Sequence, residues 1–198
     1  MIQLDSIHNH YFLLRHGQSE ANVLEIIVSN PVVGVEKYGL TPAGRSQITS
    51  SVQHAKAQGQ LDSSTLIYSS DFKRCRESAE IAFAILACPP PHFTPALRER
   101  YFGTWDLTHH SNYQQVWSLD EQDPTHTTWN VESTVAVLQR TTALIHELEA
   151  LYHAASILLI SHGDALQILQ TAFEHVSPAL HRHLPPLATA EIRRLAGS

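Results

Sequence analysis

Short apolar segments alternate with segments of helical periodicity along this chain, and this alternation constrains its fold most strongly. The apolar run at residues 11–14 is unbroken, which is typical of a strand buried on both faces of a parallel sheet. Further strands are predicted at residues 65–68, 92–97, 156–160 and 190–195. The spacing of apolar residues predicts helices at residues 42–59, 72–86, 131–148 and 165–173. The chain is therefore expected to be an α/β protein, a three-layer α/β/α sandwich with a mostly parallel central sheet.

The length and charge of the chain limit the classes of protein that it can belong to. A chain of 198 residues fits one ordinary domain, so we predict a single domain over residues 1–198. The net charge of -6 argues against general affinity for nucleic acid or acidic membranes, which are bound by an excess of Lys and Arg. The longest apolar run, residues 81–88, is too short to span a bilayer, and the first residues lack the features of a secretory signal. We expect a cytoplasmic protein without nucleic-acid or membrane partners, and its oligomeric state stays open.

Residues that suit phosphate binding follow three of the predicted strands. Arg15 and His16 follow the first strand, and His162 follows the strand that ends at residue 160. Arg74 lies in the first turn of the helix after the second strand. Ligands of parallel sheets bind outside the carboxyl ends of the strands. If the three strands are neighbours, two arginines and two histidines gather at one point, where a phosphate is the natural occupant.

These residue types suit the transfer of a phosphoryl group. The guanidinium groups of Arg15 and Arg74 can each grip two phosphate oxygens at once. His16 can attack phosphorus through an unprotonated ring nitrogen, and the adjacent Gly17 lets the backbone approach the substrate closely. His162 can stabilise the charge that develops in the transition state. Taken alone, Arg15 and His16 are equally well explained as an ordinary pair at a strand end.

The alcohol that leaves a phosphate ester needs a proton, so the site requires a general acid. The carboxyl groups that the pattern leaves open for this role are Glu77, Glu80, Glu99 and Asp106. Glu99 is flanked by Arg98 and Arg100, and such a charge run is often only a solvated surface cluster.

The histidines and cysteines do not form a recognisable metal-binding pattern. The chain has 14 histidines, but the groups at residues 109–110 and 181–183 lack the ligand set of a closed metal site. Cys75 and Cys88 form no metal-type pair and are expected to be core thiols. We therefore expect no metal and no cofactor.

Five segments of the chain form an ordered set of motifs. They read LRHGQSEAN at residues 14–22, LTPAG at 40–44, SSDFKR at 69–74 followed by SAE at 78–80, LRERYFGTW at 97–105, and SHG at 161–163. Together they resemble the histidine phosphatase superfamily, which includes the cofactor-dependent phosphoglycerate mutases. The chain is most similar to the phosphoglycerate mutase-like branch. One such motif is weak evidence, whereas five in the order of the family are strong evidence.

The resemblance implies a role for each residue of the phosphate site. His16 would be the nucleophile that accepts the phosphoryl group, and Glu99 would be the proton donor. The other residues that the resemblance assigns to the phosphate pocket are Arg15, Arg74, His162, Asn22 and Gly163. Asn22 can also be explained as the cap of a turn. The family uses no metal.

Two departures from the family pattern leave the substrate open. Residues 106–108 read DLT where the family has Glu-Gly, and Val131 replaces the glycine of a Gly-Glu-Ser turn. Both departures concern the region that covers the substrate, about residues 98–130. The chain is also more compact than the mutases of the family, which favours hydrolysis. We predict a phosphohydrolase that cleaves a small phosphomonoester through a phosphohistidine. The alternatives are a phosphoglycerate-type mutase and a non-catalytic phospholigand-binding protein on the same fold.

Overall fold

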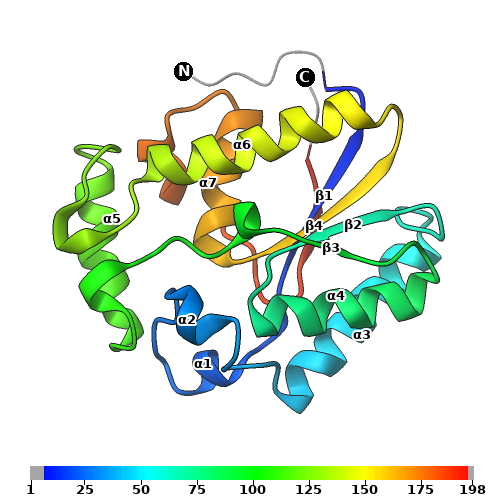
Figure 1. Ribbon diagram of the computed structural model, residues 1–198, viewed down its shortest axis with the longest axis horizontal. Coiled ribbons are helices and arrows are strands. Elements are labelled where there is room, and N and C mark those ends of the chain that lie inside the picture. Colours follow the sequence, from blue (N-terminus) through cyan, green and yellow to red (C-terminus); the bar gives the residue numbers. More distant parts are fainter. Residues whose placement is uncertain (1–6, 196–198) are drawn as a thin grey trace.

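A computed structural model of the chain describes residues 7–195, which are arranged around a central five-stranded sheet (Figure 1). The strands are β1 (His10–Arg15), β2 (Leu66–Ser69), β3 (His92–Phe93), β4 (Ser156–Ser161) and β5 (Ile192–Arg194). They lie in the order β3-β2-β4-β1-β5, in which the first four are parallel and β5 is antiparallel to β1. The prediction of a mostly parallel sheet is confirmed.

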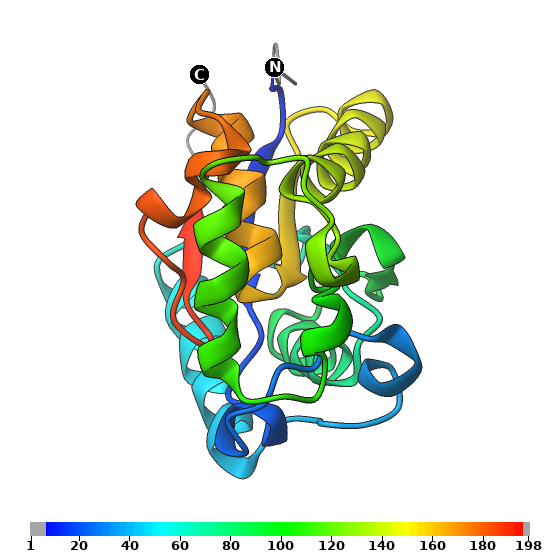
Figure 2. The ribbon, with the colours of Figure 1, turned by 90° about the vertical axis from the view of Figure 1, so that its left-hand side faces the viewer.

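Helices cover both faces of the sheet (Figures 1 and 2). Helices α3 (Pro42–Ala57) and α4 (Lys73–Leu86) lie on one face, and α6 (Thr134–Leu151) and α7 (Gly163–Phe173) lie on the other. The shorter α-helices are α1 (Glu20–Val23), α2 (Pro31–Gly34) and α5 (Tyr113–Asp120). The 3-10 helices are η1 (Pro95–Leu97), η2 (Gly103–Trp105), η3 (His110–Asn112), η4 (Thr128–Asn130) and η5 (Pro178–His183). The three-layer α/β/α arrangement is confirmed.

Strand β1 shows why its apolar run is unbroken. Successive side chains of a strand point to opposite faces of the sheet. Leu13 packs in the apolar cluster beneath α6 and α7, whereas Leu14 packs in the cluster beneath α3 and α4. Both side chains are fully buried. A strand between two helical layers therefore needs apolar residues at consecutive positions.

Helix α3 begins against the loop that follows β1. Oγ1 of Thr41 caps the helix by accepting a hydrogen bond from the backbone N–H of Gly44 at 3.0 Å. A Cβ atom at Gly44 would lie 2.0 Å from the backbone oxygen of Gln18, and one at Gly17 would lie 2.4 Å from the oxygen of Gly44. Glycine at both positions thus lets the helix approach the segment after His16.

We expect the substitution Gly44→Ala to destabilise the protein by about 1–3 kcal/mol, because the added methyl group meets backbone atoms that cannot rotate away. Urea unfolding measures this change in the free energy of unfolding. Ser50→Ala, at an exposed position of the same helix, is the matched control and should change stability by less than about 0.5 kcal/mol. Equal stability of the two variants would show that the close approach is not needed.

The predicted strand at residues 92–97 is wrong in its second half. Strand β3 ends at Phe93, and the chain then turns into η1, whose first residue is Pro95. Oγ1 of Thr94 caps this turn by accepting a hydrogen bond from the N–H of Ala96 at 3.1 Å. Because proline has no N–H for a sheet, it ends the strand pairing here. The predicted helix at residues 131–148 likewise starts later, at Thr134, because Ser133 is its cap.

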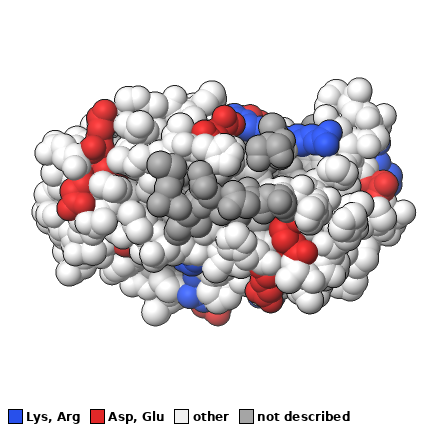
Figure 3. All heavy atoms as spheres, turned by 90° about the horizontal axis from the view of Figure 1, so that it is seen from above, with Lys and Arg blue, Asp and Glu red and all other residues white. Residues whose placement is uncertain are grey.

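Residues 98–130 form loops, 3-10 turns and helix α5, as expected from a segment without clear periodicity. In Figure 2, α5 lies in front of α7, beside the segment that contains η5. Among residues 7–195, no helix has the length and apolar character that crossing a membrane requires. On the face drawn in Figure 3, basic and acidic side chains are scattered among each other. The single-domain boundary of 1–198 and the covering role of residues 98–130 stay predictions.

Candidate active site

The carboxyl ends of β1, β4 and β2 lie side by side, because these strands are neighbours in the sheet (Figure 1). The backbone N–H of His16 donates to the carbonyl of Ser161 at 3.0 Å. On the other side of β4, the N–H of Ser70 donates to the carbonyl of Ile160 at 2.9 Å. The neighbour relation that the sequence analysis required is therefore confirmed, and the three segments that were predicted to bind phosphate meet at one edge of the sheet.

His16 is buried, with 3% of its surface exposed, and its two ring nitrogens have different partners. Nδ1 lies 2.7 Å from the carbonyl oxygen of Gly17, which can only accept, so Nδ1 carries the proton. Nε2 accepts a hydrogen bond from Nε of Arg74 at 3.1 Å. Burial, together with the charges of Arg74 and Arg15, holds the pKa of His16 well below its ordinary value. The ring is therefore neutral and has a lone pair on Nε2, which is the form that attacks phosphorus.

Arg74 connects the two histidines of the site from the first turn of α4. Its side chain is buried, and Nη2 donates to the backbone oxygen of Val28 and to Nδ1 of His162, each at 2.9 Å. Nη1 is buried and makes no hydrogen bond to a residue of the described range 7–195. Arg74 therefore has one nitrogen free for a ligand while the others fix its orientation.

Arg15 and Gly163 lie together beside this group. Nη1 of Arg15 donates to the carbonyl of Leu187 at 2.8 Å, and its Nε is buried without a partner among the described residues. A Cβ atom at Gly163 would lie 3.3 Å from Cζ and Nε of Arg15. Glycine at this position thus leaves room beside the guanidinium group, which fits a site for an anion.

His162 is fully buried, and protein groups occupy both of its ring nitrogens. Since arginine only donates, Nδ1 accepts from Arg74, and Nε2 carries the proton toward Oγ of Ser70 at 3.0 Å. The ring lies edge-on to His16, with the centroids 5.2 Å apart. Burial and the charge of Arg74 hold the pKa of His162 well below its ordinary value. In this structure His162 orients Arg74, and the expectation that it contacts the transferring oxygens stays a prediction.

Both cysteines are buried, as expected for core thiols, but Cys75 also contacts the site. Cys75 directly follows Arg74 in the first turn of α4, and its sulfur lies 3.4 Å from Nε2 of His162. Burial raises the pKa of Cys75 to about 12, so the thiol is protonated at neutral pH. Cys75 and Ser70 thus both contact Nε2 of His162. The motif positions alone did not indicate these contacts.

Glu99 is buried rather than part of a solvated charge cluster. Its Oε1 accepts hydrogen bonds from the backbone N–H groups of Arg100 at 2.9 Å and Ala165 at 3.3 Å. Burial and the negative charge of Asp164 raise the pKa of Glu99 to about 7, against the opposing charge of Arg74. A carboxyl group with this pKa can donate a proton near neutral pH.

Of the other carboxyl groups that the sequence left open, two have structural partners and one is exposed. Glu77 accepts from the N–H of Leu40 at 2.6 Å and pairs with Arg45, whereas Glu80 is exposed. Asp106 accepts hydrogen bonds from the backbone of Ser29 at 2.6 Å and of Asn30 at 3.0 Å. Among the four candidates, Glu99 is the carboxyl group that lines a cavity together with Arg15 and Gly163.

Asn22 has a structural partner in this structure. It lies in α1, is exposed, and its Oδ1 accepts hydrogen bonds at 2.9 Å from the N–H and the Oγ of Ser19. The two residues form the capping box of α1. The structure therefore supports the capping explanation, and a role for Asn22 in substrate binding stays a prediction.

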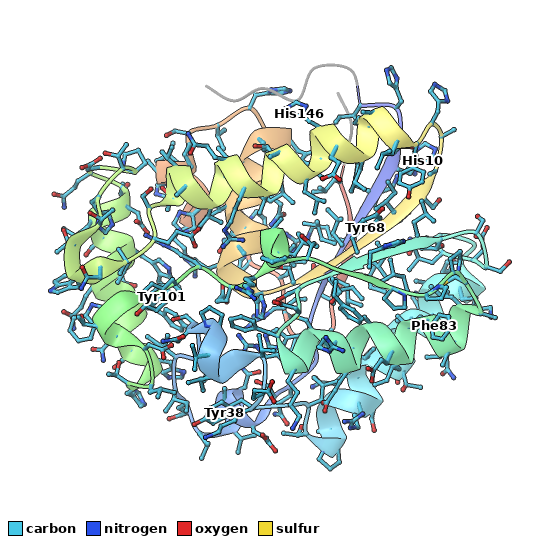
Figure 4. The ribbon with its side chains drawn as sticks, viewed as in Figure 1. His10, Tyr38, Tyr68, Phe83, Tyr101 and His146 are labelled. Carbon is cyan, nitrogen blue, oxygen red and sulfur yellow. The ribbon has the colours of Figure 1, made fainter. Side chains whose placement is uncertain are left out.

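A cavity of about 140 Å³ lies next to the residues that were predicted to bind phosphate. Its inner wall contains Arg15, Glu99 and Gly163. The other residues that line it are Tyr113, Trp117, Asp164, Gln167, Arg182, Pro186 and Leu187. Tyr113 and Trp117 come from α5 and Arg182 comes from η5, where the sequence has none of the family motifs. The motif positions therefore do not indicate these residues. Tyr101, labelled in Figure 4, follows Glu99 and Arg100 on the α5 side of the molecule.

One cluster of possible metal ligands lies outside this cavity. Glu25 approaches His109, with 3.3 Å between Oε2 and Nε2, and His110 lies beside them. All three side chains are exposed, and none lines the cavity beside Glu99. The expectation that the phosphate chemistry needs no metal stays a prediction.

Comparison with known proteins assigns the chain to a family. The profile of the histidine phosphatase superfamily (branch 1) matches residues 11–197. The adenosylcobalamin/alpha-ribazole phosphatase of Salmonella typhimurium is 27% identical over 165 residues, which cover 80% of this chain and 76% of that protein. The structure of mycobacterial glucosyl-3-phosphoglycerate phosphatase superposes with a TM-score of 0.79 at 24% identity. The match covers 96% of this chain and 91% of the mycobacterial chain. The alpha-ribazole phosphatase from Shigella flexneri has a TM-score of 0.73 at 24% identity, with coverage of 93% and 89%.

The structural likeness agrees with the sandwich fold described above, and the sequence profile spans nearly the whole chain. The order of the motifs from residue 14 to residue 163 had indicated the same relationship. This chain therefore belongs to the histidine phosphatase superfamily.

Proposed function

We propose that the protein hydrolyses a small phosphomonoester in two steps, with a phosphohistidine at His16 between them. First, Nε2 of His16 attacks phosphorus, and the bond from phosphorus to the ester oxygen breaks while Glu99 gives its proton to that oxygen. Second, water attacks the phosphohistidine and gives a proton to Glu99, and inorganic phosphate leaves. The phosphatase class is confirmed by the family match and the phosphatase relatives. The phosphohistidine and the role of each residue are part of the proposal.

One observation carries this proposal: two unpaired guanidinium donors lie in the group around a neutral histidine. Nη1 of Arg74 and Nε of Arg15 are buried without hydrogen-bond partners among residues 7–195. Unpaired buried donors are costly, and phosphate oxygens are acceptors that match them. Substrate binding also has to draw Nε of Arg74 away from Nε2 of His16, since that hydrogen bond covers the attacking lone pair.

The proposal is tested by mass balance and by trapping the intermediate. A panel of phosphorylated metabolites is incubated with the protein, and inorganic phosphate and alcohol are measured. Labelled substrate that is quenched in alkali should yield a labelled protein whose label is lost in acid, as expected for phosphohistidine. Turnover without any trapped label would contradict the intermediate. Isomer formation without inorganic phosphate would instead favour a mutase, and phosphate binding without turnover would favour a binding protein.

The pKa values predict how activity depends on pH. The pKa of His16 is well below its ordinary value, so the nucleophile is already unprotonated in mildly acidic solution. Glu99 has to be protonated, and its pKa of about 7 means that this form is lost as the pH rises above 7. For an alkyl phosphate, kcat/KM should be highest below pH 7 and fall about tenfold per pH unit well above it. Activity that rises from pH 7 to pH 9 would contradict this assignment.

We expect Glu99→Gln to slow alkyl phosphates by about 10²–10⁴-fold, because their alcohol needs the proton. An aryl phosphate such as p-nitrophenyl phosphate should lose much less, because its phenolate leaves without one. Steady-state kinetics on both esters measures the ratio. Glu80→Gln, at an exposed position of α4, is the control and should leave both rates unchanged. An equal loss on both esters would remove Glu99 as the acid.

The proposal includes the setting of the reaction. Relatives of the chain carry names of phosphatases that act on small phosphorylated compounds, such as glucosyl-3-phosphoglycerate. A small phosphorylated metabolite and a cytoplasmic location therefore remain our expectation for this chain. The substrate panel identifies the metabolite, and fractionation of the source cells tests the location.

A further inference from the structure

The carboxylate of Asp164 is in hydrogen-bonding contact with three separate parts of the chain. Nε1 of Trp117 in α5 donates to Oδ1 at 2.9 Å, and Nε2 of His181 in η5 lies 3.2 Å from the same oxygen. Nη1 of Arg100 donates to Oδ2 at 3.4 Å. The side chain of Asp164 is only 4% exposed. One buried carboxylate thus joins the start of α7 to α5, to η5 and to the segment that carries Glu99.

The same residues hold Glu99 in place. Oε1 of Glu99 accepts from the backbone N–H of Arg100 and from that of Ala165, the residue after Asp164. Arg100 in turn bonds to Asp164 through its side chain. Glu99, Arg100, Asp164 and Ala165 therefore form a closed ring of contacts, so a shift of Asp164 displaces both groups that orient Glu99.

Asp164 also fixes the outer wall of the cavity. The ring of Trp117 stacks on Tyr113, with centroids 5.1 Å apart and planes 7° from parallel. The guanidinium of Arg182 lies 3.7 Å from the centre of the Trp117 ring, and its Nη1 lies 4.0 Å from Oδ1 of Asp164. Because all three side chains line the cavity, the position of Asp164 decides the shape of the space for the alcohol part of a substrate.

The charges around Glu99 come from several elements. The titratable groups that face Glu99 are Arg15, Arg74, Cys75, Arg100, Tyr113, Asp164 and Arg182. Burial alone would raise the pKa of Asp164, but His181, Arg100 and Arg182 outweigh it and hold that pKa well below its ordinary value. Asp164 therefore keeps its negative charge beside Glu99 throughout the working pH range.

We propose that Asp164 is a positioning residue, which ties the Glu99 segment, α5 and η5 together around the proton donor and the alcohol site. The inference rests on the proposed function, in which Glu99 donates the proton. Asp164 itself transfers no proton, because its oxygens are occupied by Trp117, His181 and Arg100. Its negative charge keeps the neighbouring carboxyl group in the acid form.

The chain offers a matched control for testing this inference. Asp120 is also a buried carboxylate paired with Arg100, at 2.6 and 2.7 Å, and it contacts His126 at 2.8 Å. It lies on α5, and the main causes of the raised pKa of Glu99 are burial and Asp164, not Asp120. Asp164→Asn and Asp120→Asn therefore both weaken a buried network around Arg100, and the first alone removes the charge beside Glu99.

The experiment compares the pH dependence of kcat/KM for an alkyl and an aryl phosphate in the wild type and both variants. In Asp164→Asn, the decline of kcat/KM with rising pH should shift to lower pH by about one unit for the alkyl ester. Above pH 7 this shift corresponds to a loss of about tenfold in kcat/KM. Asp120→Asn should lower the rates on both esters by the same factor without moving the decline. An unmoved decline in Asp164→Asn, or an equal shift in both variants, would overturn the inference.

A second variant keeps the inference testable if Asp164→Asn does not fold, as judged by circular dichroism. Asp164→Glu keeps the charge but moves the carboxylate by one methylene group away from its partners. The decline should then stay near its wild-type pH while KM rises by about tenfold. An unchanged KM would overturn the positioning role. A wild type without phosphatase activity, or without any decline above pH 7, would instead refute the proposed function, so the two failures are distinguishable.

Discussion

Replacing His16 by alanine is expected to abolish the trapped phosphoprotein and to lower kcat by about 10³-fold or more. The reason is that Nε2 of His16 is the unprotonated nitrogen proposed to attack, whereas the ring of His162 is held by protein groups: its Nδ1 accepts from Arg74, and its Nε2 carries the proton toward Ser70. The thiol of Cys75 cannot take over the attack, because it is protonated and contacts His162. Rapid-quench labelling and steady-state kinetics on the same preparation measure both effects.

The control for this substitution is His146→Ala. His146, labelled in Figure 4, lies on the outer side of α6 and is exposed, so its loss should leave labelling and turnover unchanged. The His16→Ala variant should still bind inorganic phosphate, because Arg15 and Arg74 remain. A labelled intermediate that persists in this variant would assign the nucleophile to another residue.

Replacing Arg74 by lysine is expected to lower kcat/KM by about 10³-fold, although the charge is kept. Arg74 uses Nε to contact His16 and Nη2 to contact Val28 and His162, and it has Nη1 left for the phosphate. A lysine ammonium group at the end of a flexible chain cannot hold these positions at once. KM should rise and kcat should fall, because the same side chain binds the phosphate and orients the nucleophile.

Arg76→Lys is the matched control for this variant. Arg76 lies in the same turn of α4, is exposed, and packs over the ring of Phe93 at 4.5 Å, away from the site. Kinetics on an alkyl phosphate and inhibition by inorganic phosphate should be unchanged in this control. If Arg74→Lys retained activity within tenfold of the wild type, the guanidinium geometry would not matter and a simple charge would suffice.

The spacing of apolar residues in the sequence was sufficient to predict the three-layer arrangement of helices and sheet. The apolar run of β1 and the two helical layers follow from local periodicity, because a strand buried on both faces needs consecutive apolar residues such as Leu13 and Leu14. The predicted ends of strands and helices were less accurate, because capping residues and prolines end an element before its apolar pattern does. The strand predicted to residue 97 stops at Phe93, because the following turn is capped by Thr94 and continues through Pro95.

The motifs were also sufficient to select Arg15, His16, Arg74, Glu99 and His162 as candidates. Motif spacing records which residue types recur at strand ends, where the parallel topology brings them together. It contains no information on hydrogen bonds between side chains. The two histidines differ in protonation: Nε2 of His16 is unprotonated and meets Nε of Arg74, whereas His162 meets Nη2 of Arg74 through Nδ1, and this difference is visible only in the folded chain.

By itself, the sequence determined the fold class, the family and the residues that take hold of a phosphate, because these depend on periodicity and on short ordered motifs. The tertiary structure decided the protonation of the site and the shape of the cavity. Burial raises the pKa of Glu99, and Asp164 adds to this from the start of α7. Trp117 and Arg182 meet over the cavity although 65 residues separate them along the chain. Such long-range contacts depend on packing, which no local pattern encodes.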